Sequence, residues 1–240
     1  MNLILLTEAD FITTERVRLT DARFDHIKNV HQPQTGESLK TGLLNGAIGI
    51  GEVIHIDSRG IELRVELTSP PPSPLPVNLI LALPRPKMLK RIIETATSLG
   101  VKRIYLVNAY RVEKSYWGSP VLQDQELHTC CRAGLEQAVD TIMPQIILKR
   151  LFKPFVQDEL PGILAGTIPL VGHPYAINPC PVGVLKPVTL AIGPEGGFIP
   201  WEIELLQSIG FIPVHIGKRI LRVETAIPCL LARLFSSCEL

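Results

Sequence analysis

The chain has 240 residues, of which 46% are hydrophobic and 20% charged, with 24 Lys and Arg against 23 Asp and Glu. This composition supplies enough apolar side chains for a packed core, so it excludes an intrinsically disordered protein and allows one large domain or two modest ones. The net charge excludes a bulk basic field, so binding of nucleic acid would require a local basic patch.

Cysteine usage and the first residues indicate where the protein works. The five cysteines are an odd number and form no CxxC pair, which favours reduced thiols over a disulfide framework. Met1–Glu8 lacks the positive leader of a signal peptide, and no apolar run reaches the about 18 residues that a membrane span needs. We expect a soluble, cytoplasmic protein with no membrane partner and no metal.

A proline-rich segment divides the chain. Ser69–Pro76 holds five prolines in eight residues, and proline supplies no backbone donor to a helix or a strand ladder. The segment is therefore a stiff extended connector. We predict an N-terminal domain at residues 1–68, a linker at 69–76 and a second domain at 77–240.

The first domain shows short strand-like pieces separated by turn residues. We expect a helix within Asp21–Val30, capped by Asp21, and a hairpin turn at 57–60. The combination suggests a small β-barrel. The expected strands are Arg16–Leu19, Gly51–Ile56 and Ile61–Leu67.

After the connector, compact apolar strands alternate with segments of helical period. Alternation of this kind predicts an α/β domain with a mostly parallel sheet covered on both faces. The expected strands are Asn78–Leu83, Ile104–Val107, Ile146–Leu148, Ile168–Val171, Val188–Ile192 and Phe211–Ile216. The expected helices are Lys87–Leu99, one starting at Ser119-Pro120 and continuing to Ala138, Trp201–Ile209, and one starting near Thr225.

Two glycine-containing loops that follow strands are the first candidate site. The strand ending at Ile192 leads into Gly193-Pro194-Glu195-Gly196-Gly197, where glycines would let backbone groups approach a ligand closely. The strand ending at Ile216 leads into Gly217-Lys218-Arg219-Ile220-Leu221-Arg222. Ligands bind at the carboxyl ends of strands in open α/β sheets, so we expect both loops side by side at one sheet edge.

Charged residues beside these loops allow two interpretations. Arg222 and Glu224 stand between apolar residues just ahead of the last helix, where Thr225 is a plausible N-cap and Pro228 falls in the first turn. They are either functional or an ion pair that ties the loop to the helix. His173, at another strand end, is by itself more typical of a satisfied loop residue than of a catalyst.

The two loops carry a family resemblance. Gly193–Gly197 together with Arg222-Val-Glu-Thr-Ala226 resembles the "IGPEGG" and "RILR.ETA" motifs of the RsmE family of 16S ribosomal RNA uridine N3-methyltransferases. Lys87–Gly100 is similar to that family's "K…KATELG" helix, and Glu136-Gln137 matches the start of its "EQ.GR" segment. The resemblance spans the whole chain and is strongest at 78–107 and 188–232.

The resemblance implies a PUA-like N-terminal barrel and a SPOUT-type α/β domain with a C-terminal trefoil knot, a feature that no periodicity argument detects. It implies a homodimer that binds S-adenosyl-L-methionine (AdoMet) and methylates N3 of uridine 1498 in 16S rRNA of the small ribosomal subunit. The cofactor-binding residues it implies are Val171, His173, Pro174, Ile192, Gly193, Pro194, Glu195, Gly196, Gly197, Ile216, Gly217, Ile220, Leu221, Arg222 and Thr225.

The chemistry of uridine N3 assigns roles to the charged residues. The N3 proton must leave before or during methyl transfer, and a cation that stabilises the developing uracil anion lowers the barrier. We expect Arg222 to supply that cation and Glu224 to accept the proton or to hold Arg222. Cations that suit contacts to RNA phosphates are Arg18, Arg85 and Lys87.

The chain departs from the family pattern at two places. The "SGR" that follows Glu-Gln in the family is replaced by Ala138-Val139-Asp140, and the "VLR" of the barrel by Val30-His31-Gln32, so two arginines are lost. These losses leave open a different RNA target or a non-catalytic RNA-binding assembly factor. A phosphate-binding hydrolase is disfavoured, because the sequence has no GxxxxGK[ST] loop.

Overall fold

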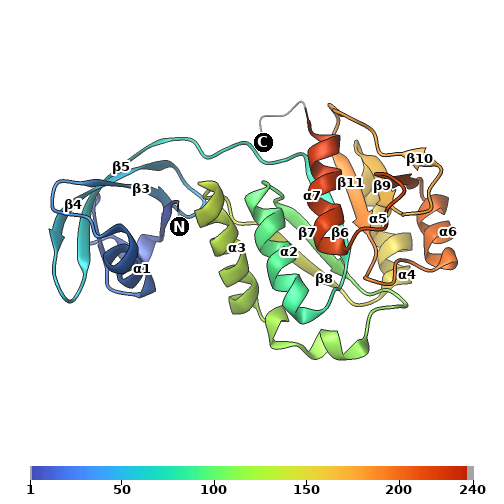
Figure 1. The fold of residues 1–240 in the computed structure, drawn as a ribbon, viewed down its shortest axis with the longest axis horizontal. Helices are drawn as coiled ribbons and strands as arrows, with labels where there is room; N and C mark the ends of the chain where they lie inside the picture. The colour runs from blue at the N-terminus through green and yellow to red at the C-terminus, as the bar shows by residue number, and fades with distance from the viewer. Residues whose placement is uncertain (1, 237–240) are drawn as a thin grey trace. The chain divides into compact units, whose positions relative to one another are not determined.

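The computed structural model describes residues 2–236, which form two compact units (Figure 1). The first unit is the chain up to Ser73 together with Arg132–Met143, and the second is Pro74–Cys131 with the chain from Pro144 onward. Cys238 lies outside the described residues. Of the other cysteines, Cys130, Cys131 and Cys180 are buried free thiols and Cys229 is an exposed one.

The first unit is built on a curled five-stranded sheet in the order β1-β3-β4-β5-β2. β1 pairs parallel with β3, and the remaining neighbours are antiparallel. The sheet is open between its edge strands β1 and β2, so the predicted barrel is a half-barrel. Its strands are β1 (Ile4–Leu6), β2 (Arg16–Leu19), β3 (Ser38–Leu43), β4 (Ile48–Ile56) and β5 (Ile61–Ser69).

Local signals of the first unit act as the sequence predicts. The Asp21 side chain accepts from the Arg23 backbone N–H and caps α1 (Ala22–His26), which continues into a π-helical turn, η2 (Ile27–His31). Asp57 Oδ1 accepts from the N–H groups of Arg59 and Gly60 and so holds the hairpin between β4 and β5. Phe24 and Ile27 pack with apolar side chains of the strands to form the core of this unit.

The second unit contains a seven-stranded sheet in the order β10-β12-β9-β11-β6-β7-β8, with every neighbouring pair parallel. This confirms the predicted parallel α/β architecture. The central strand β11 is completely buried. The strands are β6 (Val77–Ala82), β7 (Arg103–Val107), β8 (Gln145–Lys149), β9 (Ile168–Gly172), β10 (Asn178–Pro179), β11 (Val188–Ile192) and β12 (Ile212–His215).

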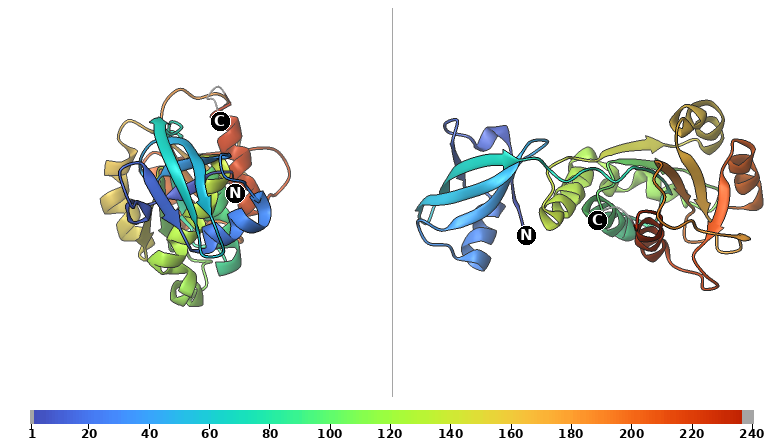
Figure 2. Two further views of the ribbon diagram at one scale, coloured as in Figure 1. Left: turned by 90° about the vertical axis from the view of Figure 1, so that its left-hand side faces the viewer. Right: turned by 90° about the horizontal axis from the view of Figure 1, so that it is seen from above.

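Helices cover both faces of this sheet, with α2 and α7 on one face and α4 and α5 on the other (Figure 2). Gly100 follows α2 with φ +83° and Gly210 follows α6 with φ +105°, the left-handed conformation in which glycine commonly ends helices. The helices are α2 (Pro86–Ser98), η3 (Lys114–Gly118), η4 (Pro120–Leu122), α3 (Asp124–Ala138), α4 (Phe152–Pro154), η5 (Phe155–Glu159), α5 (Leu160–Leu164), α6 (Pro200–Ser208) and α7 (Val223–Leu234). η1 (Glu8–Asp10) belongs to the first unit.

Three sequence predictions about helix starts are wrong. Ser119 caps only the single turn η4, and α3 begins at Asp124, because Gln123 is extended with ψ 141°. Helix α7 begins at Val223 with Arg222 as the N-cap residue, so Thr225 lies inside the first turn. Pro228 therefore lies one turn further inside the helix than expected.

No helix within residues 2–236 has the length and apolar character needed to cross a bilayer. Over the same residues, no three His, Cys, Asp or Glu side chains gather into a group that could hold a metal ion.

Candidate active site

The two glycine-containing loops meet at one edge of the seven-stranded sheet. β9, β11 and β12 are adjacent and parallel, so the segments that follow them leave from the same, carboxyl edge. This confirms the expected meeting of the loops. The first loop closes with a hydrogen bond of 2.7 Å from the Gly197 N–H to the Pro194 carbonyl.

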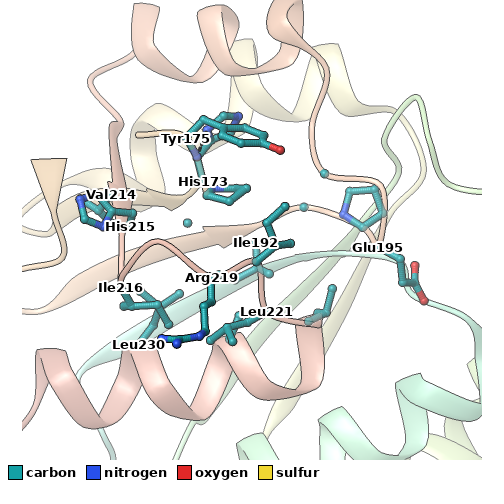
Figure 3. A pocket seen from close by; sticks show the side chains of 18 of the residues that line it. His173, Tyr175, Ile192, Glu195, Val214, His215, Ile216, Arg219, Leu221 and Leu230 are labelled. Atoms are coloured by element: carbon teal, nitrogen blue, oxygen red, sulfur yellow. Dashed lines mark hydrogen bonds between the residues drawn. The ribbon is translucent and has the colours of Figure 1, made fainter. Parts of the chain in front are cut away.

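These loops and the first turns of α7 enclose a cavity of about 330 Å³ (Figure 3). Residues after all three strands contribute to its wall. The lining residues are Arg111, Gly172, His173, Pro174, Tyr175, Ile192, Gly193, Pro194, Glu195, Gly196, Gly197, Val214, His215, Ile216, Gly217, Arg219, Ile220, Leu221, Val223, Ala226 and Leu230.

The floor of the cavity is apolar and closely packed. Ile192 and Leu230 are almost fully buried. A Cβ atom at Gly172 would lie 2.9 Å from the Cδ1 atom of Ile192, and one at Gly193 would lie 2.8 Å from the backbone nitrogen of Phe198. Glycine at these two positions therefore lets the backbone reach the cavity without distorting the loop.

Two histidines line the cavity with defined hydrogen bonds. His173 Nδ1 accepts from the Tyr175 N–H at 3.3 Å, and His215 Nδ1 accepts from the Gly217 N–H at 3.1 Å. Desolvation by burial lowers the pKa of His173 below its ordinary value. The lowered pKa favours the neutral imidazole, in agreement with the acceptor role of Nδ1.

Hydrogen bonds to neighbouring segments hold the glycine loop in place. Glu195 Oε1 accepts from the Arg85 backbone N–H at 3.1 Å, and its side chain is directed away from the cavity (Figure 3). The Arg111 guanidinium donates to the Gly196 carbonyl oxygen. The loop is thus tied both to the start of α2 and to the segment after β7.

The structure brings most of the residues implied for cofactor binding into this cavity and leaves others outside. Val171 is fully buried inside β9, and Thr225 is exposed on α7. Neither of them, nor Arg222 or Glu224, lines the cavity. The Arg222 side chain is 86% exposed and its Nη1 atom lies 4.0 Å from Glu224 Oε1, next to the lining residues Leu221 and Val223.

The three cations expected to contact RNA lie on the surface. Arg85 precedes α2 and Lys87 is in its first turn, and both are exposed. In the first unit, Arg18 Nη1 lies 3.6 Å from Glu62 Oε1.

Sequence reasoning missed several lining residues. Val214 and His215 end β12, and a strand-end rule could have found them; Val223, Ala226 and Leu230 line the cavity because α7 turns one face toward it. Arg111 and Tyr175 carried no signal in the sequence. They reach the cavity because the segments after β7 and β9 fold toward the glycine loop.

Known proteins resemble this chain over nearly its whole length. The family model described as "RNA methyltransferase domain" matches residues 71–235. "Ribosomal RNA small subunit methyltransferase E" of Treponema pallidum is 29% identical, over 94% of this chain and 87% of that protein. The protein named "Ribosomal RNA small subunit methyltransferase E 1" of Borreliella burgdorferi is 27% identical, over 94% of each chain.

Solved structures share the fold. A ribosomal RNA small subunit methyltransferase E from Neisseria gonorrhoeae, bound to S-adenosyl methionine, superposes with a TM-score of 0.74 at 22% identity, covering 97% of this chain and 95% of that chain. A methyltransferase from Legionella pneumophila, in complex with the bound cofactor SAM, gives a TM-score of 0.72 at 20% identity, covering 98% and 97% of the two chains. Since the family model matches well over half of the residues, this chain belongs to the RNA methyltransferase domain family, and its predicted place among the RsmE enzymes is confirmed.

Proposed function

We propose that this protein transfers a methyl group from AdoMet to N3 of a uridine, U1498, in the 16S rRNA of the small ribosomal subunit. The observation that carries the proposal is the cavity of about 330 Å³, built by two glycine-containing loops at the carboxyl edge of a parallel sheet. The relatives named as small-subunit methyltransferases and the SAM-bound structures of the same fold support the proposal.

The residues of the cavity suit AdoMet. The cavity volume falls within the range of about 300–1,000 Å³ typical of sites for small ligands. Ile192, Leu221 and Leu230 offer an apolar surface to an adenine ring, and the glycines bring backbone donors and acceptors to the wall. We propose that these residues hold the cofactor, with Val171 and Thr225 supporting the strand and helix behind them. When bound, AdoMet supplies an electrophilic methyl group.

The residues at the start of α7 have the chemistry to handle the uridine N3 proton. We propose that Arg222 stabilises the negative charge that develops on the uracil and that Glu224 accepts the proton or positions Arg222. Arg222 Nη1 and Glu224 Oε1 are 4.0 Å apart. In the chain, Arg222 stands between the lining residues Leu221 and Val223, and Glu224 follows Val223. The high exposure of Arg222 leaves its guanidinium accessible to an RNA substrate.

We also propose roles for the surface cations, the two domains and a second subunit. Arg18, Arg85 and Lys87 would contact RNA phosphates, and residues 1–68 would form a PUA-like RNA-binding domain joined by the 69–76 linker to a SPOUT domain at 77–240. We also propose that the protein is a homodimer and that it works in the cytoplasm, where ribosomal subunits assemble. The trefoil knot implied by the resemblance stays a prediction.

The test is methyl transfer from labelled AdoMet to small ribosomal subunits that lack the mark, with the product nucleoside identified by mass spectrometry. N3-methyluridine at one position is the expected product. No transfer by a protein that still binds AdoMet would contradict this substrate and favour another RNA, as the two lost arginines allow. No binding of AdoMet would favour the non-catalytic RNA-binding alternative.

A further inference from the structure

The carboxyl edge of the sheet continues beyond the cofactor cavity, along β6, β7 and β8. These strands are parallel to β11, so the segments after them start from the same edge as the glycine loops. The segment after β7, residues 108–118, starts beside the end of β8, because the Asn108 N–H donates to the Lys149 carbonyl, and it continues toward α3 (Figure 1, between β7 and α3). Apart from Arg111, which lines the cavity, its residues have no role in the function proposed above.

The middle of this segment is fixed to the start of α6 and to the glycine loop. Glu202, which is only 2% exposed, accepts from the Tyr110 N–H at 2.7 Å and from the Ile199 N–H at 2.9 Å. The next residue, Arg111, donates to the Gly196 carbonyl and lines the cavity. The carboxylate of Glu202 therefore joins the segment after β7 to the start of α6. Tyr110, which directly precedes the lining residue Arg111 in the chain, is 78% exposed.

The start and the end of the segment are fixed to the end of β8. Trp117 Nε1 donates to Asn108 Oδ1 at 2.9 Å, and the Asn108 N–H donates to the Lys149 carbonyl at 2.9 Å. The Arg150 guanidinium lies 5.3 Å from the centroid of the Trp117 ring, and its Nη2 atom is 3.4 Å from the Trp117 carbonyl oxygen. A cation and an aromatic ring are thus held together in one geometry at the surface.

The exposed charged side chains of this surface are three cations and one carboxylate, that of Glu113. Arg111, Lys114 and Arg150 are exposed, and among residues 2–236 none of the three has a carboxylate oxygen within 4.0 Å. Lys149, by contrast, is paired with Glu159. The cations of this surface therefore outnumber its carboxylate, and one of them, Arg150, lies against the Trp117 ring.

A surface that combines unpaired cations with exposed aromatic rings suits the binding of single-stranded RNA. The bases of unpaired RNA stack on aromatic rings and on guanidinium planes, while the phosphates attract cations. Duplex RNA would bury its base faces and could not use Tyr110 or the Arg150–Trp117 pair. The geometry therefore favours a splayed single strand as the partner.

We propose that Tyr110, Arg111, Lys114, Trp117 and Arg150, here called the Trp117 surface, bind the single-stranded RNA that flanks the methylated nucleotide. The inference rests on the proposed function for the identity of the RNA. Arg111 connects the two sites, since the same side chain contacts the glycine loop and lies at the start of the surface. The strand would cross the edge of the sheet from the cavity to Arg150.

The test compares Tyr110→Ala and Arg150→Met with the unaltered full chain. Binding of a labelled single-stranded RNA of about 12 nucleotides is measured by fluorescence anisotropy at several salt concentrations. We expect Tyr110→Ala to raise the Kd for RNA about tenfold, as for the loss of one stacked base. Arg150→Met keeps an apolar stem over Trp117 but should raise the Kd for RNA severalfold. The slope of log Kd against the logarithm of the salt concentration should fall by about 0.7, as for one lost phosphate contact to a single strand.

Matched control variants show whether a change in RNA affinity comes from the lost Tyr110 ring or the lost Arg150 charge, and not from any substitution of an aromatic or basic residue. Tyr110→Phe keeps the ring and should bind like the unaltered chain. Arg103→Met removes a cation at the opposite, amino edge of the same β7–β8 pair and should also change nothing. The melting temperature and the Kd for AdoMet should be the same in all variants, since none of the altered side chains lines the cavity.

The outcomes distinguish this inference from the proposed function. Methylation of small subunits with an unchanged KM for RNA in both Tyr110→Ala and Arg150→Met would overturn the Trp117 surface while leaving the proposed function intact. Selective loss of RNA binding in these two variants, by a protein that does not methylate small subunits, would overturn the proposed function and support the surface. Absence of RNA binding by the unaltered chain would overturn the surface.

Discussion

Arg222 combines a proposed catalytic role with almost complete exposure. Its backbone carbonyl accepts from the N–H groups of Thr225 and Ala226 at the start of α7, whereas its guanidinium forms a 4.0 Å ion pair with Glu224. An exposed pair of this kind contributes at most about 1 kcal/mol to stability. The backbone of Arg222 therefore serves the fold, and its side chain is free for chemistry.

Replacing Arg222 with Ala tests this separation. We expect methyl transfer to fall about a hundredfold or more, as when one donor to a developing anion is removed. The melting temperature and the Kd for AdoMet should stay unchanged, as measured by calorimetry. Arg103→Ala, at the opposite edge of the sheet, is the control and should retain activity. Full activity of Arg222→Ala would remove Arg222 from the mechanism.

Gly193 is the glycine of the cavity wall where an added side chain would meet the closest backbone atoms. A Cβ there would come within 2.8 Å of the Phe198 backbone nitrogen and 3.2 Å of the Gly197 backbone, and neither neighbour can move without changing the loop. Gly162, in α5, has no atom within 4 Å of the corresponding position. The two glycines therefore form a matched pair for the same substitution.

We expect Gly193→Ala to weaken binding of AdoMet and Gly162→Ala to leave it unchanged. Forcing a methyl group into a packed site costs about 1–3 kcal/mol. If that cost falls on binding, the Kd for AdoMet rises about fivefold to a hundredfold. Isothermal titration of both variants measures the effect. Equal affinities would place the cofactor elsewhere.

At the scale of elements, one ion pair joins three pieces of the first unit. Arg23, in α1, donates to both oxygens of Asp10 at 2.6 and 2.8 Å and to the Leu5 carbonyl of β1, and it also pairs with Asp21. The side chains of Asp10 and Arg23 are only 11% and 12% exposed. Burial by itself raises the pKa of Asp10, but hydrogen bonds from Arg23 and Thr7 outweigh it, and the pKa is lowered from its ordinary value of 3.8.

Replacing Asp10 with Asn should lower the free energy of unfolding of this unit by about 1.5–3 kcal/mol at neutral pH, as for hydrogen bonds to a charged partner. A carboxyl whose pKa is lowered by folding stabilises the protein above its unfolded pKa and loses that effect as the pH falls through the folded value. The difference between Asp10→Asn and the unaltered chain should therefore shrink below about pH 4.

Denaturant unfolding at neutral and acidic pH measures this difference. Asp25→Asn is the control, because Asp25 is exposed on the same helix and has no ion pair among the described residues. A difference that stays constant down to the lowest pH would contradict the role assigned to the Asp10 carboxylate.

At the scale of the whole molecule, exposed apolar side chains support the proposed homodimer. Tyr175, Ile177 and Leu185, between β9 and β11, are 76%, 93% and 89% exposed. Large apolar side chains exposed over one short segment are typical of a surface that another protein covers. A second copy of this chain is the partner that the family resemblance implies.

Light scattering of the unaltered protein should report twice the mass of one chain. Ile177→Asp should shift the mass toward that of the monomer, because a buried charge weakens an apolar interface. Val30→Asp, at an exposed apolar residue of the first unit, should leave the mass unchanged. A monomeric unaltered chain would contradict the dimer.

Local signals in the sequence determined the elements and the position of the loops. Apolar runs defined β6, β9 and β11, glycines closed α2 and α6, and the rule that parallel strands end at one edge brought the two glycine loops together. Motifs of consecutive residues identified the protein family. These features depend on interactions within a few residues or on the direction of strands, and such interactions are visible in the sequence.

Only the tertiary structure decided which side chains reach the cavity and which surface adjoins it. Arg111 and Tyr175 line the cavity although they stand outside the motifs, while Arg222 and Thr225 stand inside them and do not. The Arg150–Trp117 pair joins residues from different strand ends, and Arg23 joins α1 to η1 and β1. The physical reason is that these contacts depend on the paths of segments far apart in the chain, which packing fixes and no local pattern records.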